Sequence, residues 1–157
     1  MPLIFTTEVH IAASPERVFQ ALTDLDGARH WMQGLVDMEK TTDGPFGVGT
    51  RWKETRRMYG KNATEHFEVT SCEAPEKLML RVDGSKGSTG KGEYRFDYVV
   101  SPEGDQSHVA VSGLIDLPGL FPRLFGRLFI GSFKRAIYKD LHAMKAYVEE
   151  QSAPANG

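Results

Sequence analysis

The sequence predicts an α+β domain in which an antiparallel sheet of about seven strands packs against one long C-terminal helix. Three observations support this. Phe121 to Glu150 is the one long stretch with helical periodicity. From Leu35 onward, apolar and polar residues alternate with a period of two for about eighty residues. Short spacers rich in Gly and Pro join these segments, which indicates antiparallel hairpins.

The length of 157 residues favours a single domain, which we expect over residues 1–151 and which needs no disulfide to fold. We expect the loosely composed tail, residues 152–157, to be disordered.

The first elements follow from simple local signals. Residues 5–11 alternate as in a half-buried strand. Ser14 is a suitable N-cap and Pro15 fits the first helical position, so a short helix should begin there. Asp24 and Gly27 interrupt it, and residues 28–32 should form another turn or two that places Trp31 against the sheet.

Six further strands are expected after the two short helices. A loop rich in turn residues, 43–49, separates the first two of them. The six ranges are Leu35–Thr41, Thr50–Met58, Ala63–Cys72, Lys77–Asp83, Glu93–Ser101 and His108–Leu117.

The C-terminal helix carries an apolar stripe that must be buried on one side. Steps of four residues overshoot a turn by about 40°, so the stripe wraps around the helix. Gly126 and Gly131 are positions where the helix bends or another surface comes close. The phenylalanines of the first half either fill a core or border a cavity. The stripe consists of Phe121, Phe125, Leu128, Phe129, Phe133, Ile137, Leu141, Met144 and Val148.

In this order of elements, five segments carry a family resemblance: the opening strand leading into ASPERVF, then DLDGARHW, GVGTRWKETR, HFEVTSCEAPEKL and the closing DLHAMKAYVEE. Together they resemble the SRPBCC or START-like superfamily, closest to its polyketide cyclase/dehydrase-like branch. The resemblance implies a helix-grip fold, in which a curved sheet encloses the C-terminal helix. It also implies a pocket for an apolar or amphipathic ligand between the two.

Alternation along the strands indicates which side chains face such a pocket. Trp52, Glu54 and Arg56 share one face of their strand, so an acid and a base should point inward. Buried charges need partners, and this pair either orients the polar end of a ligand or forms a structural ion pair. The full set of expected lining residues is Trp52, Glu54, Arg56, Phe67, Tyr94, Phe96, Tyr98, Val111, Phe125, Phe129 and Phe133.

Several other functions lack support in the sequence. The formal charge of −2 gives no net attraction for nucleic acid. The five histidines are scattered, so we expect no metal, and residues 84–92 lack the spacing of a phosphate-binding loop, so we expect no cofactor. Cys72 has no evident base partner and no Gly-x-Ser-x-Gly elbow is present. No apolar run approaches the ~20 residues that span a bilayer, and no leader follows Met1, so we expect a cytoplasmic protein.

The sequence therefore predicts binding of one small apolar or amphipathic molecule of lipid, polyketide or aromatic type, by a monomer or weak homodimer. Two alternatives stay open. One is a cyclase, dehydratase or hydrolase that uses Glu54 or a pocket tyrosine for acid–base chemistry. The other is a protein-interaction module, since chaperone-activator domains share the fold. A deep cavity favours ligand binding, and a buried carboxylate near a tyrosine favours the enzyme. An exposed apolar patch favours the protein-interaction module.

Overall fold

The structure is a computed structural model that describes residues 2–152, and for residues 121–123 it describes the backbone alone. Within this range seven strands form one antiparallel sheet in the order β1-β7-β6-β5-β4-β3-β2. The strands are β1 Leu3–Ile11, β2 Leu35–Lys40, β3 Arg51–Met58, β4 Lys61–Glu73, β5 Lys77–Asp83, β6 Glu93–Glu103 and β7 Gln106–Asp116. The helices are α1 Pro15–Thr23, the short 3₁₀ helix η1 Gly27–His30 and α2 Phe121–Ser152. The predicted helix-grip fold is confirmed.

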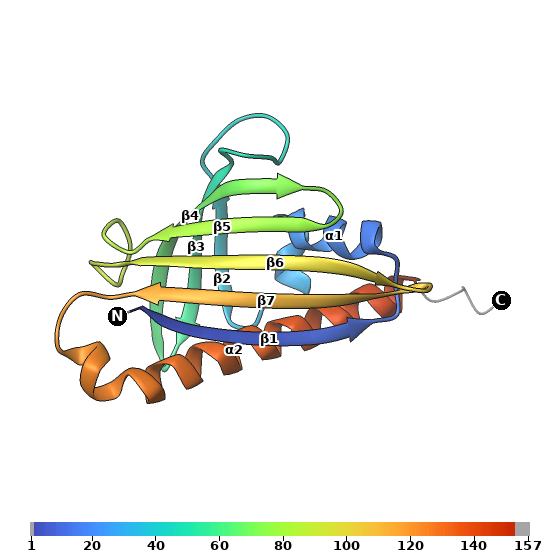
Figure 1. Cartoon of the computed structure of the whole chain (residues 1–157). Coiled ribbons are helices and arrows are strands. Elements are labelled where there is room, and N and C mark those ends of the chain that lie inside the picture. The colour runs from blue at the N-terminus through green and yellow to red at the C-terminus, as the bar shows by residue number, and fades with distance from the viewer. Residues whose placement is uncertain (1, 153–157) are drawn as a thin grey trace.

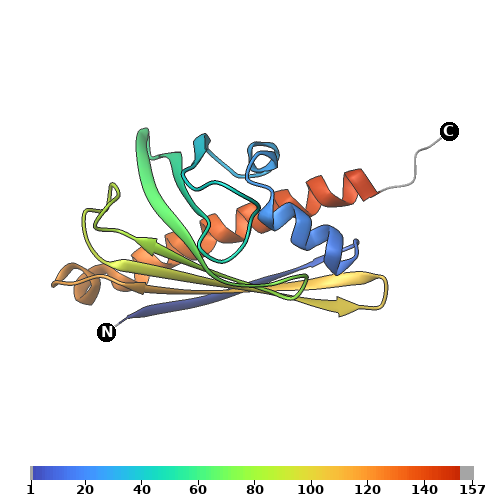
Figure 2. The same ribbon diagram turned by 90° about the horizontal axis from the view of Figure 1, so that it is seen from above.

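The sheet is curved and α2 lies along its inner side. Figure 1 shows α2 passing beside β1 at one edge, while β2 closes the other edge. In the view of Figure 2, β3 and β4 rise away from β6, β7 and β1, and α1 and α2 lie on the side toward which they rise. The segment of α1 and η1 connects the two edge strands, because β1 and β2 are at opposite ends of the strand order.

The first short helix begins as predicted. Ser14 has extended backbone angles, and its hydroxyl accepts a hydrogen bond from the backbone N–H of Arg17 at 3.3 Å. Between α1 and η1, the N–H of Gly27 donates a hydrogen bond to Asp24 Oδ1 at 3.0 Å. Trp31, directly after η1, is buried as expected and is part of the hydrophobic core.

Two hairpins are tighter than predicted. The turn between β3 and β4 consists of Tyr59 and Gly60, both with positive φ (50° and 78°), and Gly104 with Asp105 joins β6 to β7. Such two-residue turns let the ladder hydrogen bonds continue to the tip. The predicted limits of β4, β6 and β7 are therefore too short at the hairpin ends, where polar residues continue the strands.

A bulge in β4 changes which side chains face inward. The register with β5 shifts between Val69 and Ser71, so one extra residue is inserted. Strict alternation from Phe67 and Val69 would bring Ser71 to the inner face. Because of the shift, Cys72 packs against the core instead, opposite Leu78.

Burial along α2 increases toward its C-terminal end. Leu141, Met144 and Val148 are fully buried, as the stripe predicts. Leu128 is 75% exposed, so its predicted place in a buried stripe was wrong, because the stripe rotates away from the sheet toward the start of the helix. The side chain of Phe121 lies outside the described residues.

The two helix glycines differ in what lies beside them. At Gly126 an added Cβ would lie 3.0 Å from a methyl of Leu3, so β1 approaches the helix closely there. At Gly131 an added Cβ would meet nothing within 4 Å. Ser152, which the sequence suggested belonged to a disordered tail, ends α2, and residues 153–157 lie outside the described part of the chain.

Candidate functional site

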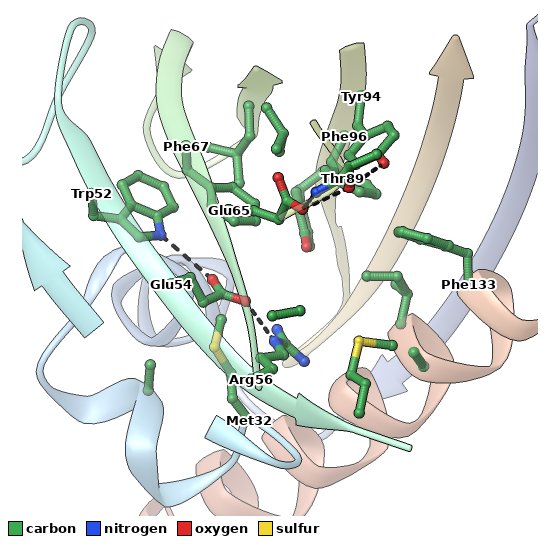
Figure 3. A pocket seen from close by; sticks show the side chains of 18 of the residues that line it. Met32, Trp52, Glu54, Arg56, Glu65, Phe67, Thr89, Tyr94, Phe96 and Phe133 are labelled. Atoms are coloured by element: carbon green, nitrogen blue, oxygen red, sulfur yellow. Dashed lines mark hydrogen bonds and ion pairs between the residues drawn. The ribbon is translucent and has the colours of Figure 1, made fainter. Parts of the chain in front are cut away.

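A cavity of about 440 Å³ lies between the inner face of the sheet and the middle of α2 (Figure 3). Side chains from the region of α1 and η1, from β3 to β6 and from α2 line it, and most of the lining is apolar. Its volume falls in the range of pockets that hold small organic molecules. Of the expected lining residues, nine border this cavity: Trp52, Glu54, Arg56, Phe67, Tyr94, Phe96, Tyr98, Phe129 and Phe133.

Two expected lining residues are elsewhere. Val111 is fully buried in the core, on β7 opposite Tyr98, and does not border the cavity. Phe125 is half exposed and borders a separate shallow groove with Leu128, Phe129 and Ser132. Each step of four residues back from Phe133 turns the side chain by about 40°, so Phe125 has rotated out of the cavity while Phe129 has not.

Aromatic rings form much of the wall. Trp52 and Phe67 face each other across the β3–β4 ladder and stack with centroids 5.3 Å apart and planes 5° apart. On the other side, Phe133 of α2 contacts Tyr94 at 5.7 Å and Phe129 at 5.2 Å between centroids. These flat, rigid surfaces suit an apolar or aromatic ligand.

One part of the wall carries a buried ion-pair network. Arg56 donates from Nε to Glu54 Oε1 and from an Nη atom to Asp140 Oδ2, both at 2.5 Å. Glu54 also accepts from the indole N–H of Trp52 at 3.4 Å, and Asp140 accepts from the backbone N–H of Gln33 at 3.0 Å. The side chains of Glu54, Asp140 and Arg56 are only 5%, 7% and 19% exposed. The predicted pair is therefore a triad that joins β3 to α2.

Burial and charge shift the acid–base properties of this network. Burial alone would lower the pKa of the Arg56 guanidinium, but Glu54 and Asp140 outweigh it and raise the pKa above its ordinary value, so Arg56 stays charged. Burial raises the pKa of the Asp140 carboxyl, and the charge of Arg56 offsets this only in part. Burial, and then the charge of Asp140, raise the pKa of the Tyr98 hydroxyl. Tyr98 thus remains a neutral phenol beside the triad.

A second polar cluster in the cavity wall consists of residues from β4, from β6 and from the connection between β5 and β6. Tyr94 donates its hydroxyl hydrogen to Thr89 Oγ1 at 2.8 Å, and Thr89 donates to Glu65 Oε1 at 2.7 Å (Figure 3). Glu54 and Glu65 are direct partners on the β3–β4 ladder, so two carboxylates leave adjacent strands on the same face. Figure 3 shows them diverging, Glu54 toward Arg56 and Glu65 toward Thr89.

The same cluster holds the β5–β6 connection, residues 84–92, against β4. Ser88 donates its N–H to the carbonyl oxygen of Thr64, and the N–H of Thr64 donates to Ser88 Oγ, both at 2.7 Å. Glu65 Oε2 is buried without a hydrogen-bond partner among the described residues. An added Cβ at Gly87 would lie 2.1 Å from this oxygen and 2.6 Å from the backbone carbonyl oxygen of Thr64, so only glycine fits above it. The glycine-rich run is thus a folded cover at one side of the cavity.

Sequence reasoning missed Asp140, Glu65 and Thr89. All charged residues of the helix before Asp140 are basic, so Asp140 is its first acidic residue, and it directly precedes the buried Leu141. This position was a usable signal. Glu65 is two residues from Phe67, so alternation already placed it on the inner face. Thr89 carried no signal, because nothing in the sequence shows how a loop folds back.

Two further observations concern the described part of the chain. No group of three or more His, Cys, Asp or Glu side chains in it is arranged to hold a metal ion. Among residues 2–152, no helix combines the length and apolar character needed to cross a membrane.

Comparisons with known proteins agree with this architecture. Among solved structures, the chain is similar to the protein TTHA0849 from Thermus thermophilus, with 20% identity, a TM-score of 0.80 and coverage of 96% of this chain and 99% of the other. A START superfamily protein from Mycobacterium smegmatis is 14% identical, with a TM-score of 0.76 and coverage of 95% of this chain and 99% of the other. A norcoclaurine synthase from Thalictrum flavum is 18% identical, with a TM-score of 0.74 and coverage of 98% of each chain. At these identities the likeness concerns the fold alone.

Comparison with curated proteins found no match. The family model described as polyketide cyclase / dehydrase and lipid transport matches residues 2–149, which is nearly the whole chain. The protein therefore belongs to this polyketide cyclase / dehydrase and lipid transport family, and its fold is that of a START superfamily protein.

Proposed function

We propose that the protein binds one small amphipathic molecule in the cavity of about 440 Å³, with the apolar body against the aromatic wall and a polar end at the triad of Glu54, Arg56 and Asp140. The observation that carries this proposal is the combination of a largely apolar lining with one buried, charged network that has donors to spare. Apolar pockets with a few convergent polar groups are typical ligand sites.

The unused hydrogen-bonding groups favour a particular kind of polar end. Arg56 has five N–H donors, of which two are engaged with Glu54 and Asp140. The hydroxyl of Tyr98, beside the triad, makes no hydrogen bond to a described residue. Together these groups match a ligand oxygen that accepts, as in a ketone or an alcohol.

The charge balance argues against an anionic end. With one cation and two carboxylates, the triad carries a formal charge of −1, or zero when Asp140 is protonated. A ligand carboxylate would add a further buried negative charge at a cost of several kcal/mol. We therefore infer a neutral hydroxyl or carbonyl oxygen at this end.

The experiment is a fluorescence titration of Trp52 in a Trp31→Phe background with two matched probes, a long-chain methyl ketone and the carboxylic acid of the same length. We expect saturable changes in emission and tighter binding of the ketone. Tyr98→Phe should weaken ketone binding by roughly threefold to tenfold, because it removes one hydrogen bond. Tyr138→Phe is the matched control, since that tyrosine is half exposed and outside the cavity lining. No saturable change with either probe, together with no co-purifying molecule in native mass spectrometry, would refute ligand binding.

Acid–base catalysis on such a ligand is the second candidate. The observation that favours it is the hydrogen-bond chain from Tyr94 through Thr89 to Glu65, which connects a cavity hydroxyl to a carboxylate with one buried oxygen. One protein of this fold, norcoclaurine synthase, is an enzyme by its name. If the chain acts in catalysis, a bound ligand should change mass or isomeric form on incubation with the protein but not with Glu65→Gln. An unchanged ligand in both samples would leave binding alone.

A further inference from the structure

The first half of α2 exposes apolar side chains to solvent. Leu124 and Leu128 are 74% and 75% exposed, Leu120 just before the helix is 70% exposed, and Phe125 is 50% exposed. Single exposed apolar residues are ordinary, but four within nine residues form a patch. This surface is not part of the cavity described above.

The same segment is strongly basic. Residues 117–139 hold five of the 19 basic side chains and none of the 21 acidic ones. The rest of the chain, with 14 basic and 21 acidic side chains, therefore has a formal charge of −7. A charge asymmetry of this size in one helical segment indicates an interaction with negative charge.

Helix geometry brings the apolar and basic groups onto one side. Leu124 and Leu128 are four residues apart, Arg135 follows two turns after Leu128, and Lys139 is four residues further. All four are exposed, as are Gly131 and Ser132 between them. We call the surface of Leu120, Leu124, Phe125, Leu128, Arg135 and Lys139 the docking face.

A second, smaller cavity of about 180 Å³ lies beside the basic end of the docking face. Arg135 and Lys139 border it, and it shares Arg56, Met58, Tyr59 and Ala136 with the lining of the central cavity. Tyr59, at the tip of the β3–β4 turn, is 89% exposed. The basic end of the docking face therefore lies beside the wall of the central cavity.

We propose that the docking face binds the surface of an anionic lipid bilayer, with the leucines at the boundary of headgroups and acyl chains and the basic side chains against phosphates. Amphipathic helices with this composition lie in the bilayer interface with their apolar side buried by about 5–10 Å. Leucines on a convex helix surface need no shaped pocket in lipid, whereas a protein partner would have to supply pockets and acidic groups together. The absence of acidic side chains from residues 117–139 fits a uniformly negative surface.

This proposal goes beyond the proposed function and does not depend on it. Vesicle binding is measured on the protein without added ligand, and ligand binding is measured in solution without vesicles. The failure of one is therefore distinguishable from the failure of the other.

The test is flotation of the purified protein with vesicles of phosphatidylcholine containing about one third phosphatidylglycerol, compared with pure phosphatidylcholine. We expect binding to the anionic vesicles that declines as salt is added. Leu124→Ser with Leu128→Ser should reduce the bound fraction by about tenfold, because apolar insertion is lost. Arg135→Gln with Lys139→Gln should reduce it by about tenfold and flatten its salt dependence.

The matched control is Val36→Ser with Val48→Ser, which removes two exposed valines (53% and 70%) outside α2 and should leave flotation unchanged. All substituted side chains are exposed, so circular dichroism should show wild-type folding, and the charge pair tests the proposal independently of the leucine pair. Absence of flotation with anionic vesicles overturns the proposal. So does self-association that Leu124→Ser with Leu128→Ser abolishes in the absence of vesicle binding, which would assign the face to a second copy.

Discussion

At the scale of single residues, Arg56 explains why two acids can lie in an apolar interior. Glu54 comes from the same strand and Asp140 from the middle of α2, 84 residues later in the chain. An unpaired carboxylate at either place would be costly, and one guanidinium with planar, forked donors serves both. Arg56 is therefore a structural link between sheet and helix as well as a candidate ligand contact.

This role gives a prediction for stability. Arg56→Met should lower the free energy of unfolding by about 3–5 kcal/mol, because it strands two buried carboxylates. Replacing the whole triad, with Glu54→Gln and Asp140→Asn added, should recover part of that loss. Arg51→Met is the matched control on the outward face of β3, since Arg51 is 60% exposed and its ion pair with Glu68 should contribute at most about 1 kcal/mol. Urea denaturation measures all three, and a loss below ~0.5 kcal/mol for Arg56→Met would contradict the prediction.

At the scale of elements, two glycines that each lie inside a regular element, one in a strand and one in a helix, have opposite roles. Gly113 of β7 lies opposite Phe5 of β1 and Phe96 of β6, and an added Cβ would lie 2.1 Å from the Phe5 ring. Its missing side chain gives the Phe5 ring its place on the inner face. Gly131 is an exposed position within α2 where an added Cβ meets nothing, so there it only weakens the helix.

We therefore expect opposite effects of the same substitution. Gly113→Ala should destabilise the protein by about 1–3 kcal/mol through overpacking against Phe5. Gly131→Ala should stabilise it by roughly 0.5–1 kcal/mol, which is the difference in helix propensity between the two residues. Thermal denaturation followed by circular dichroism compares the two variants. Destabilisation by Gly131→Ala would mean that this position has a contact or a bend that needs glycine.

The elements also show what the sequence could and could not predict. Period-two alternation placed Trp52, Glu54 and Arg56 on the inner face because β3 is regular from end to end. Continued past Val69, it would bring Ser71 rather than Cys72 to the inner face, because a bulge is a tertiary feature that inserts one residue without a local signal. Nine of the predicted lining residues border the cavity, but Asp140 and Thr89 were not predicted. The triad is closed by a helix, and residues 84–92 fold back onto β4, so both arrangements depend on contacts between distant segments.

At the scale of the whole molecule, the two halves of α2 have different surroundings. Its second half is fixed in the core through Leu141, Met144 and Val148, which are essentially inaccessible to solvent. Its first half exposes most of its side chains and borders the cavity through Phe129 and Phe133. A ligand of the central cavity would meet the less anchored half, so movement there is the simplest way to admit it.

The last prediction concerns this division of α2. Leu141→Ala should cost about 2–5 kcal/mol, as a large-to-small change in a packed core does, whereas Leu128→Ala on the exposed side should cost less than ~0.5 kcal/mol. Amide hydrogen exchange should be faster over residues 124–131 than over residues 141–148, because opening of the first half exposes little apolar surface that was buried before. Protection that is uniform from Leu124 through Tyr147 would mean that α2 opens only as a single unit. In that case movement of residues 84–92, which the Glu65 and Thr89 contacts hold against β4, would be the next candidate for ligand entry.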